Sequence, residues 1–467
     1  MSRIWTLVFL MLAVSPGLIS PAHSRAQTDV APLSVAAAGL INPRGFAFTS
    51  EGQLIVAESG TGGETAATED VPAPTGPYTG GPTGAVVRIA ASCPTPLAAN
   101  LASARGAGGE SIGPSAVVII GDKIYALAAG GGAAHGNPDQ PAGIYDVTTG
   151  SPVLLADLSG WLRTNPVANP PENDFDPDGS WYSMATDSAG SALWVVESNS
   201  EQVVRVDLDG AITRIADLSA DNQVPTAIAI GPDGAIYVGH LTSAPFTAGS
   251  ATVIKIGTDN KTETVWSGLT MITGLAIDRQ GTLYASELSG GRDHPPFFVP
   301  GTGRIVRQTG ADSLEEVATL LNLPTTIQFG PDAALYVSMP AVGADTGTGV
   351  ILRVETGAPL PLRAEDYDLT PPSCSGAEQG PTLIKLSDLG IDPASITITA
   401  GTTVTWRNTG EFEHSTKADP SSPVQWDSGS LIPGQEFVQT FDQPGTYPYF
   451  DGVFPDHRGT IEVIAGQ

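Results

Sequence analysis

One arrangement of apolar and polar residues recurs along most of the chain. An apolar stretch of strand length ends in a turn that contains glycine, and a second apolar stretch follows directly. In one copy the turn contains Asp233-Gly234, a strong hairpin signal because both residues tolerate the backbone angles of tight turns. The pattern predicts six β-hairpins, at residues 43–58, 114–127, 182–197, 225–240, 272–287 and 324–338.

Further apolar strand pairs follow several of these hairpins, for example at Val203–Ile215 and Arg304–Arg307. Units of four short strands, repeated about every 40 to 70 residues, are typical of β-propeller blades. We therefore predict an all-β fold with a six-bladed β-propeller. The apolar segment at residues 33–37 precedes the first hairpin and would complete the last blade. A set of β-sandwiches is the alternative architecture, but it explains the regular repeat poorly.

Short motifs in this region carry a resemblance to a known family. They are the segment Gly39–Gly45 with the sequence GLINPRG, the segment Gly81–Ile89 with the sequence GPTGAVVRI, and the Gly-Pro-Asp-Gly hairpin turn. With these motifs, residues 31–357 resemble the secreted propellers of the ScyD/ScyE type, which are related to NHL and gluconolactonase-like propellers. The resemblance implies a six-bladed propeller outside the cytoplasm. It implies no particular activity.

Beyond the repeat, residues 358–384 are rich in Pro, Gly and Ser and are interpreted as a linker. Residues 385–467 resemble a plastocyanin-like cupredoxin domain, on the segments ITITAGTTVTWRN (396–408), EH (413–414) and GTYPYFDGVFPDHRG (445–459). The resemblance implies a β-sandwich related to copper-binding electron-transfer proteins. In that family a C-x-x-H-P-x-M loop supplies three ligands, and those positions are Asp451, Phe454 and His457 here.

The family ligand His414 is kept, while the cysteine position holds an aspartate. His414, Asp451 and His457 offer two imidazoles and one carboxylate, a set that suits Cu(II) or Zn(II) better than Cu(I). One hypothesis is therefore an altered, non-blue copper site. The alternative is a cupredoxin fold used only for binding or packing, with both histidines as surface loop residues. A blue copper site would require a thiolate from elsewhere in the chain.

A second candidate metal site is the acidic loop at residues 173–179. Asp174, Asp176 and Asp178 alternate ahead of Gly179, as in some calcium loops. The twelfth position of the loop is Ala185 rather than the glutamate of an EF-hand. The hypothesis is a weak calcium site, and the alternative is a solvated acidic loop.

A third group of candidates lies where the innermost propeller strands would begin, at the funnel in which propellers bind ligands. Calcium-dependent lactonase propellers place Glu, Asn and Asp there, while this chain offers mainly hydroxyl and aromatic side chains. The candidate funnel residues are Asn42, Arg44, Ser115, Trp181, Tyr182, Thr226, Thr273 and Thr325.

Four more polar residues, Glu58, Glu197, His240 and Glu287, recur where the second strand of a hairpin ends. They are interpreted as turn caps or surface charges. His135 and His294 lie in Gly- and Pro-rich loops and have no visible partner for nucleophilic catalysis.

The net charge of −28 excludes nucleic acid and anionic lipid as partners, because both require clustered basic residues. Residues 1–26, with a basic start, an apolar middle and a small-x-small end, are expected to be a cleaved signal peptide, the alternative being a membrane anchor. No later stretch is long and apolar enough to cross a bilayer. The two cysteines, Cys93 and Cys374, are expected to form a disulfide outside the cytoplasm.

Together these features favour an exported, non-enzymatic protein. The propeller would be a scaffold for a small molecule or an extracellular protein, and the C-terminal domain a copper-type module with an altered site. One alternative is a copper-dependent electron-transfer protein. Another is a hydrolase or lactonase that acts in the propeller funnel.

Overall fold

The computed structural model describes residues 31–72, 76–171, 175–220, 223–372, 374, 382–388, 390–410 and 412–464. The expected signal peptide lies outside these residues. The described chain is nearly all β-structure, with α1 (Leu158–Thr164) and 3-10 turns at Ala133–His135 and Ala364–Asp366 as its helical elements. None of the described helices is both long enough and apolar enough to span a membrane.

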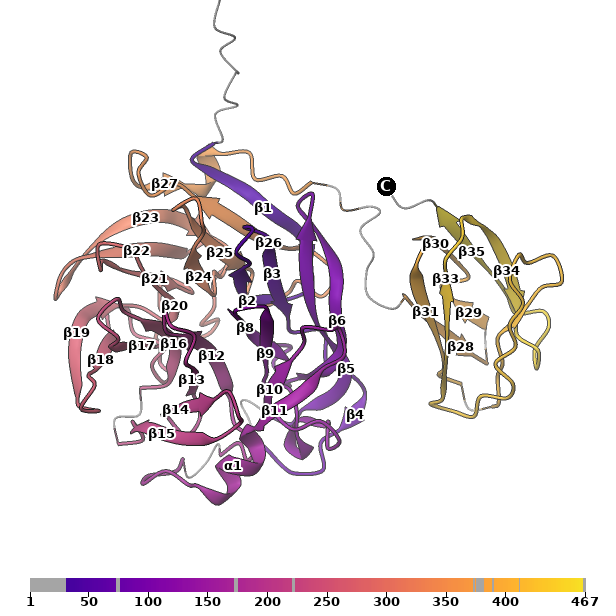
Figure 1. Cartoon of the computed structure of the whole chain (residues 1–467), viewed down its shortest axis with the longest axis horizontal. Coiled ribbons are helices and arrows are strands. Elements are labelled where there is room, and N and C mark those ends of the chain that lie inside the picture. Colours follow the sequence, from indigo (N-terminus) through magenta and orange to yellow (C-terminus); the bar gives the residue numbers. More distant parts are fainter. Residues whose placement is uncertain are drawn as a thin grey trace, which may run out of the picture. The chain divides into compact units, whose positions relative to one another are not determined.

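Six sheets account for residues 33–363, and the first three follow one another along the sequence (Figure 1). The first contains β2 (Pro43–Phe48), β3 (Leu54–Glu58), β5 (Thr79–Ala90), β6 (Cys93–Arg105) and β7 (Ser111–Ile112), with β4 (Thr65–Ala66) paired to β5. The second contains β8 (Pro114–Ile120), β9 (Lys123–Ala128), β10 (Gly143–Asp146) and β11 (Val153–Asp157). The third contains β12 (Trp181–Thr186), β13 (Ala192–Glu197), β14 (Gln202–Asp207) and β15 (Ile212–Asp217).

The next three sheets repeat the same order of strands. The fourth contains β16 (Pro225–Ile230), β17 (Ile236–His240), β18 (Ala251–Ile256) and β19 (Thr262–Leu269). The fifth contains β20 (Ile272–Ile277), β21 (Leu283–Glu287), β22 (Gly303–Gly310), β23 (Ser313–Leu321) and β27 (Leu362–Arg363). The sixth contains β24 (Ile327–Phe329), β25 (Leu335–Met339), β26 (Gly349–Val354) and β1 (Leu33–Leu40).

All six predicted hairpins are confirmed as antiparallel pairs, from β2–β3 through β24–β25. The N-terminal strand β1 pairs with β26 in the sixth sheet, as its position ahead of the first hairpin led us to expect. Gly234 of the Asp-Gly turn has a φ of 77°, the left-handed conformation that favours glycine there. Local turn chemistry and apolar periodicity thus determine these pairings.

The first strands of the six sheets lie next to one another in chain order, and β2 also packs against β24 and β25. These strands line one channel of about 380 Å³. Apolar clusters fill the space between consecutive sheets. One such cluster joins Leu127 and Ile144 of the second sheet to Val195 and Val204 of the third. Burial of these side chains holds each sheet against the next.

The segment predicted as a linker is ordered in part. Leu362 and Arg363 form β27, which runs parallel to β23, and Leu362 is buried in the apolar cluster of the fifth and sixth sheets. Cys374 forms a disulfide with Cys93, with an S–S distance of 2.13 Å. This part of the segment therefore packs on the first six sheets.

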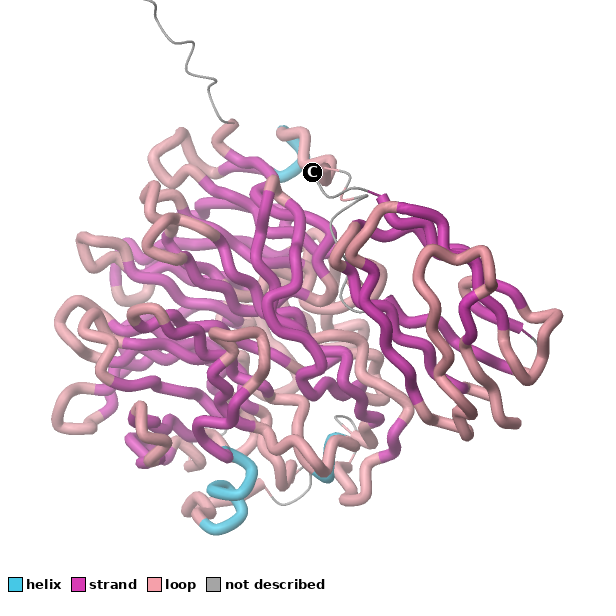
Figure 2. Tube along the Cα trace, turned by 45° about the vertical axis from the view of Figure 1, so that its right-hand side comes forward, coloured by secondary structure: helices cyan, strands magenta, loops and turns pink. Residues whose placement is uncertain are grey.

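Two further sheets form the C-terminal domain. One has the order β29 (Gly390–Asp392), β28 (Thr382–Ser387), β31 (Thr402–Asn408) and β33 (Glu436–Phe441). The other has the order β30 (Ser395–Thr399), β35 (Arg458–Ile464), β34 (Gly445–Phe450) and β32 (Lys417–Ala418). Figure 2 shows the strands of these two sheets running side by side, with loops at both ends. The core contains Trp406, Trp426, Phe441 and Tyr449, whose rings contact one another.

Candidate metal centre

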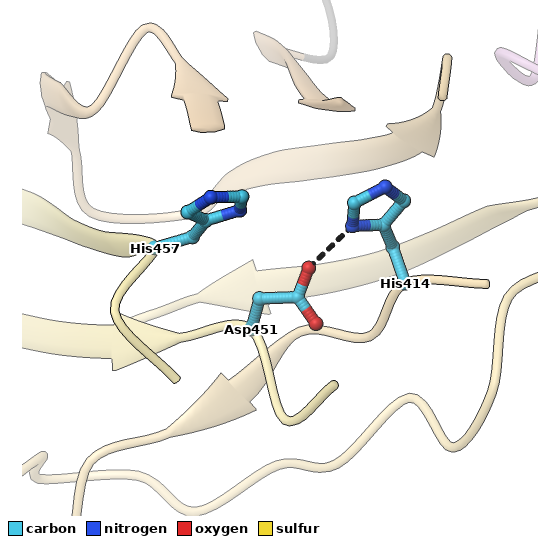
Figure 3. Close-up of side chains that lie close together, drawn as sticks. All are labelled: His414, Asp451 and His457. Atoms are coloured by element: carbon cyan, nitrogen blue, oxygen red, sulfur yellow. Dashed lines mark hydrogen bonds and ion pairs between the residues drawn. The ribbon is translucent and has the colours of Figure 1, made fainter. Parts of the chain in front are cut away.

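Two loops of the C-terminal domain bring His414, Asp451 and His457 together (Figure 3). His414 follows β31 and forms two backbone hydrogen bonds with Leu431, of 3.0 and 2.8 Å. Asp451 directly follows β34, and His457 directly precedes β35. The Asp451 amide donates to the His457 carbonyl at 2.9 Å, which closes the loop between the two strands. The sheet framework therefore holds all three side chains.

The three candidate ligand atoms all lie within 4.8 Å of one another. His414 Nδ1 lies 2.5 Å from Asp451 Oδ2, and both residues are fully buried. Asp451 Oδ1 accepts from the amides of Ser415 and Val453, each at 2.9 Å. One oxygen of the carboxylate is thus held by the backbone, while the other faces the histidines.

His457 supplies a polar atom without a partner. Its Nδ1 is buried and forms no hydrogen bond with the described residues. Its ring stacks on Phe454 at 5.4 Å between centroids, and Phe454 also contacts the His414 ring at 5.0 Å. A buried nitrogen left unpaired costs free energy unless another group binds it. The position of this nitrogen, facing a histidine and a carboxylate, fits a metal ligand.

Asp388 is a further residue of the candidate site that the sequence analysis missed. Its Oδ1 lies 3.0 Å from Nε2 of His414, on the far side of the ring from Asp451. A side chain at Gly410 would prevent this approach, because a Cβ there would lie 2.3 Å from Asp388 Oδ1 and 2.7 Å from His414 Nε2. A carboxylate on the second nitrogen of a ligating histidine orients the ring toward a metal.

These residues fit a metal with imidazole and carboxylate ligands. His414, Asp451 and His457 would hold Cu(II) or Zn(II), which suit this set of two nitrogens and one oxygen. A thiolate is not available, since the disulfide uses both cysteines of the chain. A blue copper site therefore does not fit. The alternative that placed both histidines on the surface is wrong for His414, which is fully buried.

The acidic loop gives calcium no support. Asp174 lies outside the described residues. Asp176 accepts from the amides of Asp178 and Gly179 and pairs with His135 Nε2 at 2.9 Å. Asp178 accepts from the Ala134 amide at 2.7 Å and from Arg163 at 2.8 Å. Both described carboxylates are buried and accept hydrogen bonds from protein groups. The alternative of a solvated acidic loop is therefore wrong for Asp176 and Asp178.

His135 also has a carboxylate partner that the sequence did not reveal. Burial alone would lower the pKa of His135, but Asp176, Asp178 and the hydrogen bonds to Asp176 and Gly131 raise it overall. Burial would raise the pKa of Asp176, but His135 and two backbone amides lower it. The pair is an enclosed histidine–carboxylate contact between the 3-10 turn Ala133–His135 and the loop before β12. His294 is exposed and contacts Asp293 at 2.6 Å.

The eight funnel candidates do not form one site. Only Thr273 among them lines the channel, and most of the other lining residues have apolar side chains. Asn42 donates to the Gly60 carbonyl and to Asp345, and Trp181 Nε1 donates to the Asp178 carbonyl. The hydroxyl groups of the four Ser and Thr candidates donate to backbone carbonyls. These are Ser115, Thr226, Thr273 and Thr325.

The glutamates at the hairpin ends are caps, and the surface-charge reading of them is wrong. Glu58, Glu197 and Glu287 are all buried. Each accepts a hydrogen bond from a backbone amide that lies just before the first strand of its own sheet. The donors are the amides of Ile41, Ser180 and Thr270, respectively. Burial raises the pKa of both Glu58 and Glu197 to about 7. His240 is buried as well, with Nδ1 3.1 Å from the Thr252 carbonyl.

The chain shares sequence with small copper proteins over less than a fifth of its length. Amicyanin-alpha of Methylorubrum extorquens is 29% identical over 89 residues, which are 19% of this chain and 75% of amicyanin. Plastocyanin of Scenedesmus fuscus is 34% identical over 70 residues, 13% of this chain and 71% of plastocyanin. No family model matches the chain.

Solved cupredoxins are similar over the same share of the chain. A purple cupredoxin from Nitrosopumilus maritimus has 23% identity and a TM-score of 0.17, with 18% of this chain and 99% of that protein covered. An oxidised mutant of amicyanin has 22% identity and a TM-score of 0.18, with 18% of this chain and 83% of amicyanin covered.

Proposed function

The chain belongs in part to the cupredoxins related to plastocyanin and amicyanin, and we propose that this part, residues 385–467, binds divalent copper without a thiolate. His414, Asp451 and His457 are the proposed ligands. The observation that carries the proposal is the buried, unpaired Nδ1 of His457 beside the His414–Asp451 pair. A single ion bound there would take the place of the proton between His414 Nδ1 and Asp451 Oδ2 and would also satisfy the His457 nitrogen.

A carboxylate in the place of the cysteine changes the chemistry that copper would supply. An oxygen ligand favours the oxidised ion, whereas a thiolate favours Cu(I) and gives an intense visible colour. We propose a site that keeps copper as Cu(II) and has no thiolate absorption. Electron transfer is the second candidate function. The relationship to plastocyanin and amicyanin supports it, and the ligand set does not.

The experiment is a metal titration of the wild type and of His414→Ala. We expect one Cu(II) per wild-type chain, an electron paramagnetic resonance spectrum of the non-blue kind, and no intense visible band. His414→Ala should lose more than about 100-fold in affinity, because ligand loss exceeds the 10- to 100-fold effect of a supporting residue. His294→Ala is the matched control, since His294 is exposed and paired with Asp293.

Two results would contradict this proposal. An intense blue colour would mean that a thiolate binds copper. Equal copper affinity in the wild type and in His414→Ala would mean that the metal binds elsewhere. Reversible reduction of the bound copper at a potential accessible to biological donors would favour electron transfer instead.

We further propose that the six sheets form a six-bladed propeller that serves as a binding scaffold in an exported protein. The β1–β26 pairing, which joins the two ends of this region in one sheet, supports the ring, as does the shared channel. The channel lining contains no acidic residue, histidine or cysteine, so it offers no support for a hydrolase or lactonase. The proposed ligand of the scaffold is a small molecule or an extracellular protein.

A further inference from the structure

The second residue of each innermost strand usually connects two sheets. Ser115 Oγ donates to the Trp181 carbonyl of the next sheet at 3.0 Å. Thr226 Oγ1 donates in the same way to the Ile272 carbonyl at 2.6 Å, and Thr273 Oγ1 to the Pro324 carbonyl at 2.9 Å. In these sheets a short hydroxyl side chain is required, because only a short side chain places its oxygen beside the neighbouring strand.

Arg44 and Tyr182 occupy the corresponding positions of β2 and β12 and break this rule. In their sheets the connection comes from the residue after the second strand. Ser59 Oγ donates to the Pro114 carbonyl at 3.4 Å, and Ser198 Oγ donates to the Pro225 carbonyl at 2.6 Å. Arg44 and Tyr182 are therefore not needed for the hydrogen bond to the next sheet, and both positions hold long side chains with polar ends.

Arg44 is half-buried and forms no ion pair with any acidic side chain of the described residues. Its guanidinium donates to the carbonyls of Ser111 at 3.0 Å and Pro43 at 3.4 Å. Arg163, Arg304 and many other arginines of the described chain pair with acidic side chains, as expected at a net charge of −28. A guanidinium has five N–H donors, so most of those on Arg44 are unused. Burial without a counter-ion lowers the pKa of Arg44.

Tyr182 lies close enough to Arg44 for the two to interact electrostatically. Burial raises the pKa of Tyr182, and Arg44 partly opposes this rise. The Tyr182 hydroxyl forms no hydrogen bond within the described part of the chain. β8 packs against both β2 and β12, so Arg44 and Tyr182 lie at the beginnings of the two strands that flank β8. Their electrostatic interaction indicates that the cation and the hydroxyl lie near each other.

That place is the end of the channel where the innermost strands begin. Residues 45–48 and 183–186, which directly follow Arg44 and Tyr182, line the channel. Most of the residues that line the channel beyond them have apolar side chains, with Phe46, Met184 and Leu275 among them, and polar atoms are exposed between these side chains. The site therefore has a cationic, hydrogen-bonding entrance and an interior formed mainly by apolar residues.

We propose that Arg44 and Tyr182 bind the carboxylate of a small ligand whose apolar part lies in the channel. The planar guanidinium matches a carboxylate in two parallel hydrogen bonds, and the Tyr182 hydroxyl supplies a third donor. The carboxylate provides the counter-ion that Arg44 lacks, and the apolar part is removed from water along the channel wall. This inference rests on the proposed scaffold role of the six sheets and is independent of the metal site.

The test is calorimetric binding of octanoate to the full chain. The wild type is expected to bind octanoate, and Arg44→Gln to bind it about 10- to 100-fold more weakly, because a charge-assisted pair is lost. Tyr182→Phe should weaken binding about 5-fold, as for one neutral hydrogen bond. Arg88→Gln is the charge-matched control, since Arg88 lies exposed on β5, and its affinity should equal that of the wild type.

Two other probes identify the chemistry that is recognised. Octanol, which lacks the charge, and octyl phosphate, which carries a different anion, should both bind more weakly than octanoate. If Arg44→Gln does not fold, Arg44→Lys keeps the charge without the planar fork and should give an intermediate affinity. Each variant is also titrated with copper, so that failure of the metal proposal is recognised separately.

The proposal is overturned if octanoate does not bind, if octanol or octyl phosphate binds as tightly, or if Arg44→Gln keeps the wild-type affinity. Octanoate bound equally by Arg44→Gln and Arg88→Gln would point to nonspecific apolar binding.

Discussion

Two buried histidine–aspartate pairs occur in this chain, His135–Asp176 among the first six sheets and His414–Asp451 in the C-terminal domain. Both have short contacts, of 2.9 and 2.5 Å, and an aromatic ring lies against each histidine, Tyr78 and Phe454 respectively. By composition the two pairs look alike. What surrounds them differs.

The first pair is closed. Nδ1 of His135 lies 2.8 Å from the Gly131 carbonyl, so this nitrogen must donate a hydrogen bond. Asp176 accepts hydrogen bonds from two backbone amides. The second pair is open on one side, because the unpaired Nδ1 of His457 lies beside it. A buried histidine–carboxylate pair is therefore no sign of a metal site by itself. The feature that indicates a metal site is the additional nitrogen without a partner, Nδ1 of His457.

The largest effect is expected for His135→Ala, which tests whether the closed pair stabilises the fold without binding metal. Removing one partner of a buried pair leaves an unpaired charge and costs about 4 kcal/mol of stability. We expect that loss in the hydrogen exchange of β9 and β12 amides, together with unchanged copper binding. His294→Ala should show neither effect. Reduced copper stoichiometry in His135→Ala would show that the closed pair also holds metal.

The next effect concerns a buried carboxyl group that has an amide instead of a histidine as its partner. Burial raises the pKa of Glu58 to about 7, although the Ile41 amide lowers it in part. Because the folded state holds this proton more tightly than the unfolded state, the stabilisation is complete below about pH 4.5 and is lost as pH rises through 7. The expected loss is about 3 kcal/mol.

Glu58→Gln should lack this slope, since glutamine stays neutral and still accepts from Ile41. Hydrogen exchange of β3 amides at pH 5 and pH 8, corrected for intrinsic rates, measures the difference. An identical pH dependence in the variant would mean that Glu58 is ionised throughout.

A smaller effect is expected when the support of the open pair is weakened. Asp388→Asn should reduce copper affinity about 10- to 100-fold, because Asp388 orients the His414 ring. Asp427→Asn is the control in the same domain, since Asp427 is exposed and pairs with Lys417. The measurements are competitive copper titration and the paramagnetic spectrum of the bound ion. Equal affinities in the two variants would remove Asp388 from the site.

The smallest effect sharpens the description of the closed pair. Ser180 Oγ contacts Asp176 Oδ2 at 3.4 Å, which is long for a hydroxyl donor. Ser180→Ala should therefore cost less than about 1 kcal/mol, measured by hydrogen exchange of β12. A loss as large as that of His135→Ala would mean that the hydroxyl holds the carboxylate in place.

The sequence predicted what local patterns control. Hairpins depend on apolar alternation and turn residues a few positions apart, so all six could be located. His414, Asp451 and His457 could be named because the cupredoxin framework places their loops. Pairs of distant residues could not be found in this way. Asp388 lies 26 residues before His414, and Asp176 lies 41 residues after His135, with no motif that connects them.

Burial was the other property that the sequence did not reveal. Glutamates after strands resemble surface charges in a sequence, and only the packing of neighbouring sheets shows that Glu58 and Glu197 are enclosed. The alternation of the acidic loop likewise resembled a calcium site. The carboxylates of Asp176 and Asp178 are instead buried and paired with His135 and Arg163.

The disulfide has a consequence for biosynthesis. Cys93 and Cys374 are 281 residues apart, and β1 likewise finds its partner β26 only near the end of the first six sheets. At about 5 to 20 residues per second, a ribosome needs roughly 15 to 55 s to advance from the first cysteine to the second. Throughout that interval Cys93 must remain a free thiol and β1 an unpaired strand. A nascent chain of this protein is thus exposed to wrong thiol partners and to strand aggregation until Cys374 and β26 have been synthesised.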